Sequence, residues 1–440
     1  MDALVFRTLR RLVKTGSLTI TTANGVARIF GDGAGVAVKA RFRTATAQRR
    51  VLLDPELRLG EAFVDGDLII EQGTITQFLE LLLSQNHNGA APITTKVLAG
   101  LRFVLRRLAQ KNGRRRSRQN VAHHYDLSRK LYELFLDEDM QYSCAYFERA
   151  DVSLDEAQQA KKRHIAAKLL PNRDERVLDI GCGWGGLALY LAETFGARVT
   201  GITLSAEQLE FARARAASAA DPRRLDFRSQ DYRDVGGRFD RIVSVGMFEH
   251  VGVNHYDAFF RKCRDLLDDE GVLLLHSIGR SDEPGFTNPW IAKYIFPGGY
   301  IPSLSEVLPA IERSGLVITD IEILRLHYAE TLRHWRERFL ARRAEAVQLF
   351  DERFARLWEY YLGVSELAFR YQGMMVFQIQ IAKRQDAVPL TRDYIGKEEH
   401  RLQGLRRDND NTAGGCADMD GYAACVSAVR RNTDSATFVY

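Results

Sequence analysis

The chain has 440 residues, 45% hydrophobic and 27% charged, a composition typical of a globular protein large enough for two domains. A formal net charge of +5 is too small to indicate nucleic-acid binding by the chain as a whole. No apolar run approaches the roughly 20 residues that span a bilayer. Basic residues interrupt the apolar N-terminus, so we expect no signal peptide and a cytoplasmic location.

The five cysteines are scattered and include no Cys-x-x-Cys pair. This pattern argues against a disulfide framework and against a zinc site, and it agrees with a reducing compartment. We therefore expect no metal.

Residues 1–120 are expected to form a separate N-terminal domain, with a small β-rich meander first and an apolar helical stretch over 57–83. A basic amphipathic helix follows and runs into an arginine-rich linker. Its apolar stripe consists of Val97, Leu101, Val104, Leu105 and Leu108. Two interpretations are open: the stripe enters the headgroup boundary of an anionic membrane, or it faces the protein core.

Residues 121–390 are expected to form a second domain, because β-rich runs alternate there with helical patterns. The expected strands are 177–180, 199–202, 225–228, 241–245 and 272–278. The pattern predicts an α/β fold with a doubly wound, mostly parallel sheet that binds its ligand at the C-terminal ends of the strands. A helix over 303–314, one long helix over 333–362 and a final strand in the apolar run at 369–383 complete it. Residues 391–440 lack periodicity and are expected to be a disordered tail.

A glycine turn follows the first strand of this sheet, in the sequence RVLDIGCGWGG at 176–186. Its glycines allow positive φ and let backbone N–H groups approach a ligand. NAD enzymes share such a turn but place an acid about 20 residues further on, whereas the second strand here ends in Thr-Leu-Ser. Asp179 lies inside the strand instead. This is the first motif of S-adenosylmethionine methyltransferases, which we favour over an NAD enzyme.

Polar residues follow the fourth and fifth strands. Glu249 and His250 come after the fourth strand, and His276 ends the fifth, so their side chains converge on one edge of the sheet and are interpreted as a site. Enzymes that methylate amino groups of nucleic acids tend to carry an Asn/Asp-Pro-Pro-aromatic loop after the fourth strand. Its absence disfavours an RNA methyltransferase that would use the basic run at 114–118, and we expect no nucleic-acid partner.

Several segments resemble, in family order, the cyclopropane-fatty-acyl-phospholipid synthase family. They include HHYDLS at 123–128, QYSCAYFE at 141–148, FEHVG at 248–252, PWIAKYIFPGG at 289–299 and HYAETLRHWRERF at 327–339. The resemblance covers residues 120–385. The N-terminal unit resembles the extra domain of phospholipid-type members, which their mycolic-acid relatives lack.

The resemblance implies methyl transfer from S-adenosylmethionine to the cis double bond of an unsaturated phospholipid acyl chain, followed by proton loss and ring closure. It implies a bound bicarbonate as the base, held by the side chains of Glu249, His276 and Tyr328 and by backbone near Cys144 and Ile278. Cys144 as a covalent nucleophile is disfavoured, because alkene methylation needs no acyl intermediate.

The resemblance also implies the cofactor contacts. Gly181, Gly183 and Gly185 would hold the methionine portion; Thr203, Leu204 and Gln208 the ribose; Asp231 and Tyr232 the adenine; and Tyr142 and Ser143 would close over the ligand. Ser205 in the same stretch also suits a helix N-cap.

Partners follow from this interpretation: unsaturated phospholipids, the inner face of the membrane as a peripheral binding surface, and a homodimer as one arrangement. Two alternatives stay open. A sister reaction on the same scaffold would give a methylene- or methyl-branched chain, and a catalytically silent relative would only bind or transfer lipid.

Overall fold

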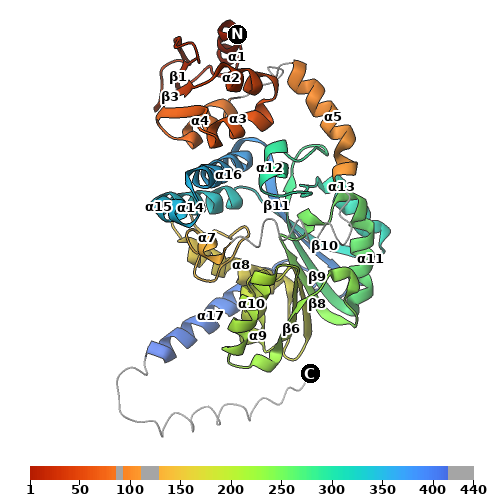
Figure 1. Ribbon diagram of the computed structural model, residues 1–440. Helices are drawn as coiled ribbons and strands as arrows, with labels where there is room; N and C mark the ends of the chain where they lie inside the picture. Colours follow the sequence, from red (N-terminus) through yellow and green to blue (C-terminus); the bar gives the residue numbers. More distant parts are fainter. Residues whose placement is uncertain (86–92, 111–127, 415–440) are drawn as a thin grey trace, which may run out of the picture. The chain divides into compact units, whose positions relative to one another are not determined.

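The computed structural model describes residues 1–85, 93–110 and 128–414. Its described residues up to Arg392 form one compact unit, and those from Asp393 onward belong to a second. The N-terminal sheet and the large sheet both belong to the first unit (Figure 1).

The first sheet has the order β2-β1-β3-β4. Its strands are β1 Ser17–Thr21, β2 Ala27–Phe30, β3 Ala37–Phe42 and β4 Leu68–Gln72, accompanied by α1 Asp2–Leu12, α2 Ala45–Leu53, α3 Pro55–Val64 and α4 Ile75–Leu83. Because β1 pairs antiparallel with β2 and parallel with β3, the expected meander is wrong. The continuous helix over 57–83 is also wrong, since a turn with Gly66 at φ 76° follows α3 and β4 precedes α4.

The large sheet has the order β10-β11-β9-β8-β5-β6-β7. Its strands are β5 Arg176–Ile180, β6 Arg198–Thr203, β7 Leu225–Ser229, β8 Phe239–Val245, β9 Leu267–Arg280, β10 Val317–Leu324 and β11 Met374–Ala382. β5 to β9 pair in parallel, β11 pairs antiparallel with β9, and the edge strand β10 pairs antiparallel with β11. The predicted α/β fold is confirmed, although β10 was not expected.

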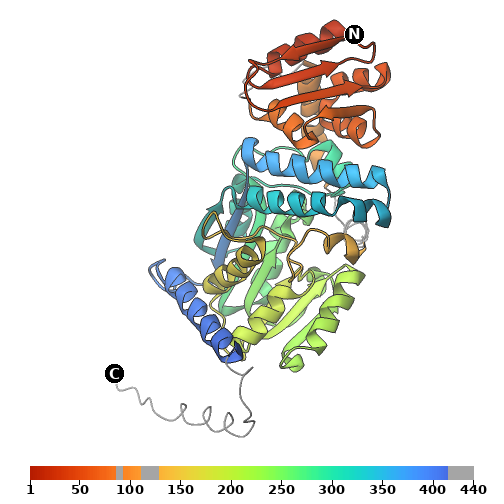
Figure 2. The same ribbon diagram turned by 90° about the vertical axis from the view of Figure 1, so that its left-hand side faces the viewer.

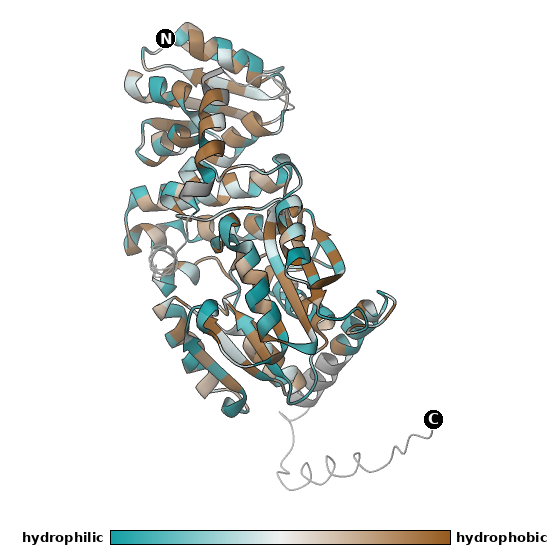
Figure 3. Cartoon of the chain, turned by 90° about the vertical axis from the view of Figure 1, so that its right-hand side faces the viewer, coloured by the Kyte–Doolittle hydropathy of each residue, from teal (hydrophilic) through white to brown (hydrophobic). Residues whose placement is uncertain are grey.

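Helices cover both faces of this sheet (Figure 2). They include α8 Leu154–Leu169, α9 Gly186–Phe195, α10 Ala206–Ala217, α11 Tyr256–Leu266 and α13 Leu304–Arg313. The central strands are mostly brown in Figure 3, in keeping with the buried side chains of β9 and β11. Such nearly continuous apolar strands are typical of a sheet buried on both faces.

The helix expected over 333–362 is three helices: α14 His327–Ala341, α15 Arg343–Leu349 and α16 Glu352–Tyr371. The single-helix prediction is wrong because Phe350 leaves helical geometry, at φ −132° and ψ −101°, and Asp351 caps α16 by accepting a hydrogen bond from the Phe354 N–H. Antiparallel packing of α14 on α16 becomes possible through these breaks. Trp335, Phe339 and Trp358 are then buried in one core.

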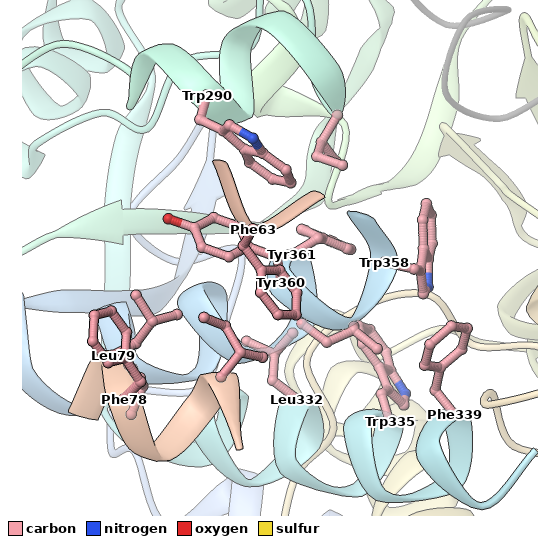
Figure 4. Packing of buried hydrophobic residues seen from close by; sticks show 14 of the residues in the cluster. Phe63, Phe78, Leu79, Trp290, Leu332, Trp335, Phe339, Trp358, Tyr360 and Tyr361 are labelled. Atoms are coloured by element: carbon pink, nitrogen blue, oxygen red, sulfur yellow. The ribbon is translucent and has the colours of Figure 1, made fainter. Parts of the chain in front are cut away.

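The N-terminal domain packs on the helices inserted in the second domain. Figure 4 shows Phe63 of α3 beside Tyr360 of α16, with Phe78 of α4 and Trp290 of α12 (Pro289–Tyr294) in the same cluster. Contact is close at Gly60 of α3, where a Cβ would lie 2.6 Å from the Trp290 indole nitrogen and 2.7 Å from the Tyr360 ring. Any larger residue at this position would push the two layers apart.

The remaining described helices include α5 Ile93–Ala109, α7 Arg129–Tyr132 and, in the second unit, α17 Tyr394–Gly414. The expectation of disorder from residue 391 is wrong for α17, because Lys397 and Arg401 form helix-spaced ion pairs with Asp393 and Glu398. Residues 415–440 of the expected tail lie outside the described residues. No helix in the described ranges is long and apolar enough to cross a bilayer.

Candidate active site

A cavity of about 160 Å³ lies at the C-terminal ends of the parallel strands. Of the predicted cofactor residues it brings together Tyr142, Ser143, Gly181, Gly183, Thr203, Leu204, Gln208, Asp231 and Tyr232. At Gly181, with φ 86°, a Cβ would lie 2.7 Å from the Met247 Cβ, so only glycine leaves room for the turn. The cavity is therefore built around the turn that the sequence singles out.

Gly185 does not line this cavity. It is the N-cap of α9 with φ 85°, and a Cβ there would meet Ala212 and Phe227 at 3.0 Å. Its role is thus close packing of the turn against α10 and β7.

The polar groups predicted to contact ribose and adenine are held by neighbouring residues. Gln208 Oε1 accepts a hydrogen bond from Thr203 Oγ1 at 3.1 Å, and the Gln208 N–H donates to the N-capping Ser205 Oγ. Asp231 is bound by both Nε and Nη2 of Arg233, at 2.8 and 2.6 Å. This side therefore offers a fixed frame of polar atoms.

The loop that carries Tyr142 and Ser143 is held by α8. Gln158 Nε2 donates to the carbonyls of Gln141 and Ser143, and Lys161 Nζ donates to Ser143 Oγ at 2.7 Å. Lys161 also lines the cavity, and sequence reasoning missed it. The signal was weak, since a lysine in a helix normally faces water.

A second cavity of about 510 Å³ adjoins the first. Tyr142, Ser143, Gly246 and His250 line both. The second cavity also brings together the predicted catalytic residues Cys144, Glu249, His276, Ile278 and Tyr328. A ligand in the first cavity and a ligand in the second would therefore contact the same four residues.

Glu249 and His276 are both buried in the wall of the second cavity. Glu249 follows β8 on the 3₁₀ helix η3 Phe248–His250, and its Oε1 accepts a hydrogen bond from the Ile278 N–H at 2.7 Å. Its Oε2 is buried without a hydrogen-bond partner. Burial raises the pKa of Glu249 to about 7. A carboxyl group with one unsatisfied oxygen can act as a proton acceptor here.

His276 lies within β9, which continues past the expected end of the strand to Arg280. Gln378 Oε1 accepts from Lys168 Nζ at 2.7 Å, which orients the amide so that Gln378 Nε2 donates to His276 Nδ1 at 3.1 Å. Burial holds the pKa of His276 well below its usual range. The ring is therefore neutral and carries its proton on Nε2 as a hydrogen-bond donor.

Cys144 is 1% exposed, and its thiol donates to the neighbouring Ala145 carbonyl. Burial raises the pKa of this thiol. The thiolate is the nucleophilic form, so the geometry opposes the alternative of covalent catalysis.

Sequence reasoning missed the far walls of the second cavity. α16 contributes Tyr361, Val364, Ser365, Ala368 and Phe369, and the N-terminal domain contributes Glu56 and Ala99. No local motif marks these residues. The N-terminal domain thus forms part of the cavity, although nothing in its sequence pointed to the site.

Helix α5 presents its apolar stripe to solvent. The exposed fractions are 66% for Val97, 55% for Leu101, 72% for Val104 and 45% for Leu105. On the protein side, Arg102 is held by Asp54 and Glu56 at 2.7 Å each. These exposures oppose the core-facing interpretation of the stripe; the side chain of Leu108 lies outside the described residues.

The chain is similar to one family model and to several known proteins. Residues 112–379 match the family model described as mycolic acid cyclopropane synthetase. The chain is 38% identical to cyclopropane-fatty-acyl-phospholipid synthase of Escherichia coli, over 80% of this chain and 91% of that protein. It is 35% identical to tuberculostearic acid methyltransferase UfaA1 of Mycobacterium tuberculosis, over 86% of this chain and 90% of that protein.

Among solved structures, mycolic acid cyclopropane synthase CmaA1 complexed with SAH and CTAB matches with a TM-score of 0.57 and 35% identity. The match covers 60% of this chain and 97% of CmaA1. The cyclopropane synthase MmaA2 from Mycobacterium tuberculosis gives a TM-score of 0.58 at 33% identity, over 60% of this chain and 98% of that one.

Proposed function

The chain belongs to the mycolic acid cyclopropane synthetase family and is an S-adenosylmethionine-dependent methyltransferase, and we propose that it converts the cis double bond of unsaturated phospholipid acyl chains to a cyclopropane ring. The observation that carries the proposal is the pair of adjoining cavities. The second, lined by aromatic and aliphatic side chains with Glu249 and His276 in its wall, suits an alkyl chain with one reactive position. The E. coli relative, named a phospholipid synthase, matches along both domains.

The residues of the first cavity fit the cofactor. Gly181 leaves room that a Cβ would fill, and Asp179 Oδ2 is a buried acceptor without a partner. S-adenosylmethionine bound here supplies an electrophilic methyl group on a sulfonium. Tyr142 and Ser143 in the shared wall then orient the alkene toward that methyl and exclude water.

Attack by the alkene leaves a carbocation on the acyl chain, and a proton must leave the added methyl group for the ring to close. Bicarbonate, held by Glu249, His276 and Tyr328, would supply the base. Glu249 accepts the hydroxyl proton of the anion through its unsatisfied Oε2, and the neutral His276 donates from Nε2. Cys144 and Ile278 contribute backbone next to these side chains.

The bicarbonate site is tested by the bicarbonate dependence of turnover. Tyr328→Phe should raise the bicarbonate concentration for half-maximal activity. Tyr361→Phe is the matched control, since it removes another hydroxyl from the same cavity, one that lies 2.8 Å from the Tyr142 hydroxyl. Equal shifts in both variants would contradict the site.

Phospholipid substrates require access to a membrane, and α5 supports this. Its exposed stripe flanks the second cavity, whose lining includes Ala99 of α5 and Glu56 beside it. We assign α5 to the peripheral binding of the membrane surface on the cytoplasmic side, with the stripe in the headgroup boundary. The arginine at 102 instead ties α5 to the protein, so its loss should loosen the helix rather than remove a lipid contact.

The product is tested by expressing the chain in a host without this activity and analysing its membrane fatty acids by mass spectrometry. Addition of one CH₂ with loss of the double bond and a ring in the fragmentation pattern supports cyclopropanation. UfaA1, named a tuberculostearic acid methyltransferase, supports a second candidate, a methyl- or methylene-branched product from the same cation. An exocyclic alkene or a saturated branch would favour that outcome, and unchanged lipids would favour a silent lipid-binding protein.

A further inference from the structure

Lys161 of α8 is a buried lysine with 1% of its surface exposed. It lies in the wall of the first cavity, which is called the cofactor cavity below. Its Nζ donates to Gln141 Oε1 at 2.6 Å and to Ser143 Oγ at 2.7 Å. An ammonium group has three N–H donors. No described residue forms an ion pair with Lys161 or accepts its third hydrogen bond, so one donor of this cation is left for another group.

The next residue provides a contrast. Lys162 is also buried, but its Nζ forms an ion pair with Asp139 Oδ2 at 2.6 Å, and it does not line the cavity. Both lysines hold the same loop through side chains. Only Lys161 is buried without a carboxylate partner, and burial lowers its pKa to about 8.

The charges that line the cofactor cavity are Lys161, Asp179, Asp231 and Arg233. Asp231 and Arg233 neutralise each other in a two-point ion pair. Lys161 and Asp179 remain, and Asp179 Oδ2 is buried without a hydrogen-bond partner. Lys161 and Asp179 act on each other through space, and Asp137 also acts on Lys161, but neither Lys161 nor Asp179 forms an ion pair among the described residues. A ligand that carries both signs would bind both groups directly.

We propose that Lys161 binds the α-carboxylate of the methionine portion of S-adenosylmethionine, and that Ser143, held by Lys161, is positioned beside it. Asp179 faces the ammonium group of the same zwitterion. The inference rests on S-adenosylmethionine as the cofactor and is independent of the acyl product.

The lining of the two cavities favours the carboxylate of the cofactor over the bicarbonate proposed for the second cavity as the ligand of Lys161. Lys161 lines the cofactor cavity, together with Gly181 and Gly183, and does not line the cavity that contains Glu249 and Tyr328. Lys161 also acts through space on Cys144 and His276 of the second cavity, but its own side chain lines only the cofactor cavity, and we therefore assign it to the carboxylate of the cofactor.

The experiment compares two ligands by calorimetry: S-adenosylhomocysteine, and 5′-methylthioadenosine, which has no amino-acid group. Lys161→Met should weaken S-adenosylhomocysteine binding about tenfold or more, as expected for loss of a charge-assisted hydrogen bond, and leave 5′-methylthioadenosine within about threefold. Lys162→Met is the matched control, which should preserve the preference for S-adenosylhomocysteine. Equal weakening of both ligands by Lys161→Met would assign Lys161 a structural role and overturn the proposal.

A measurement on the unmodified protein covers the case in which Lys161→Met does not fold. The carboxamide of S-adenosylhomocysteine keeps the shape of the ligand and loses its negative charge. It should bind about tenfold more weakly than S-adenosylhomocysteine. Equal affinity of the two would overturn the proposal, whereas no binding of either would instead count against the cofactor assignment itself.

Discussion

The two adjoining cavities are built in different ways. The cofactor cavity is small and takes its lining from residues 140–251, chiefly from strand ends and the turns that follow them. The second cavity, called the acyl cavity below, is larger and is lined by residues between Glu56 and Met374. Its walls come from the N-terminal domain, α14, α16 and β11. A backbone turn can hold a ligand common to many enzymes, while a wall of inserted helices can change with the substrate. Substitutions should therefore separate cofactor binding from chemistry.

The largest effect should come from Glu249→Gln in the acyl cavity. The variant keeps the side-chain shape but cannot accept a proton, so turnover should fall about 100-fold or more. Affinity for S-adenosylhomocysteine, measured by calorimetry, should stay within about twofold because Glu249 does not line the cofactor cavity. A parallel loss of turnover and of affinity for S-adenosylhomocysteine would contradict separate roles for the two cavities.

Gly181→Ala should produce the opposite pattern in the cofactor cavity. A Cβ 2.7 Å from the Met247 Cβ, on a backbone at φ 86°, strains the turn by about 1–2 kcal/mol or more. We expect about tenfold weaker binding of S-adenosylhomocysteine. Gly236→Ala is the matched control, since no atom lies within 4 Å of its Cβ position. Equal affinities of the two variants would contradict the role of the turn.

Replacing Leu101 and Val104 of α5 by Asp should leave both cavities intact and impair delivery of the substrate. Anionic vesicles should be bound about tenfold more weakly in a sedimentation assay, because apolar contact is lost and negative charge is added. Ile29→Asp, at a residue 73% exposed on β2, controls for any exposed apolar side chain. Activity on a detergent-dispersed phospholipid should be retained, and unchanged vesicle binding would remove the assigned role of α5.

The smallest effect concerns the pH dependence of stability. The pKa of Glu249 is raised from 4.5 to about 7 in the folded chain, so the folded state holds this proton over a pH range in which the unfolded state releases it. The contribution is present below pH 4.5 and is lost as pH rises through 7, by about 3 kcal/mol at most. Relative to the parent chain, Glu249→Gln should therefore gain stability between pH 5 and pH 8, as measured by chemical denaturation. A stability difference between Glu249→Gln and the parent chain that does not change with pH would contradict the raised pKa of Glu249.

The cofactor side of the molecule could be predicted because its signals are local. A strand, a glycine turn and a helix lie within one stretch, and parallel strands bring their ends to one edge. The acyl side could not be derived in this way. The division of α14, α15 and α16 depends on the backbone of Phe350 and on contacts such as Gly60 with Trp290, which join residues far apart in sequence.

Lys161 is another residue whose role sequence patterns could not predict. Its helix, α8, buries residues on most of its circumference, including Lys161, Lys162 and Lys168. A helix pattern assigns such lysines to the solvent face, and only the tertiary contacts reveal their partners. The family resemblance implied the loop residues Tyr142 and Ser143 but not the lysine that donates to Ser143.

Tyr142 and Ser143 line both cavities, and the Tyr142 hydroxyl lies 2.8 Å from that of Tyr361 on α16. The two cavities therefore share a wall through which occupancy of one can act on the other. By thermodynamic reciprocity, whatever factor an acyl chain imposes on the affinity for the cofactor, the cofactor imposes on the affinity for the acyl chain. Positive coupling would retain an acyl chain while the cofactor is bound and would weaken its binding once the cofactor leaves.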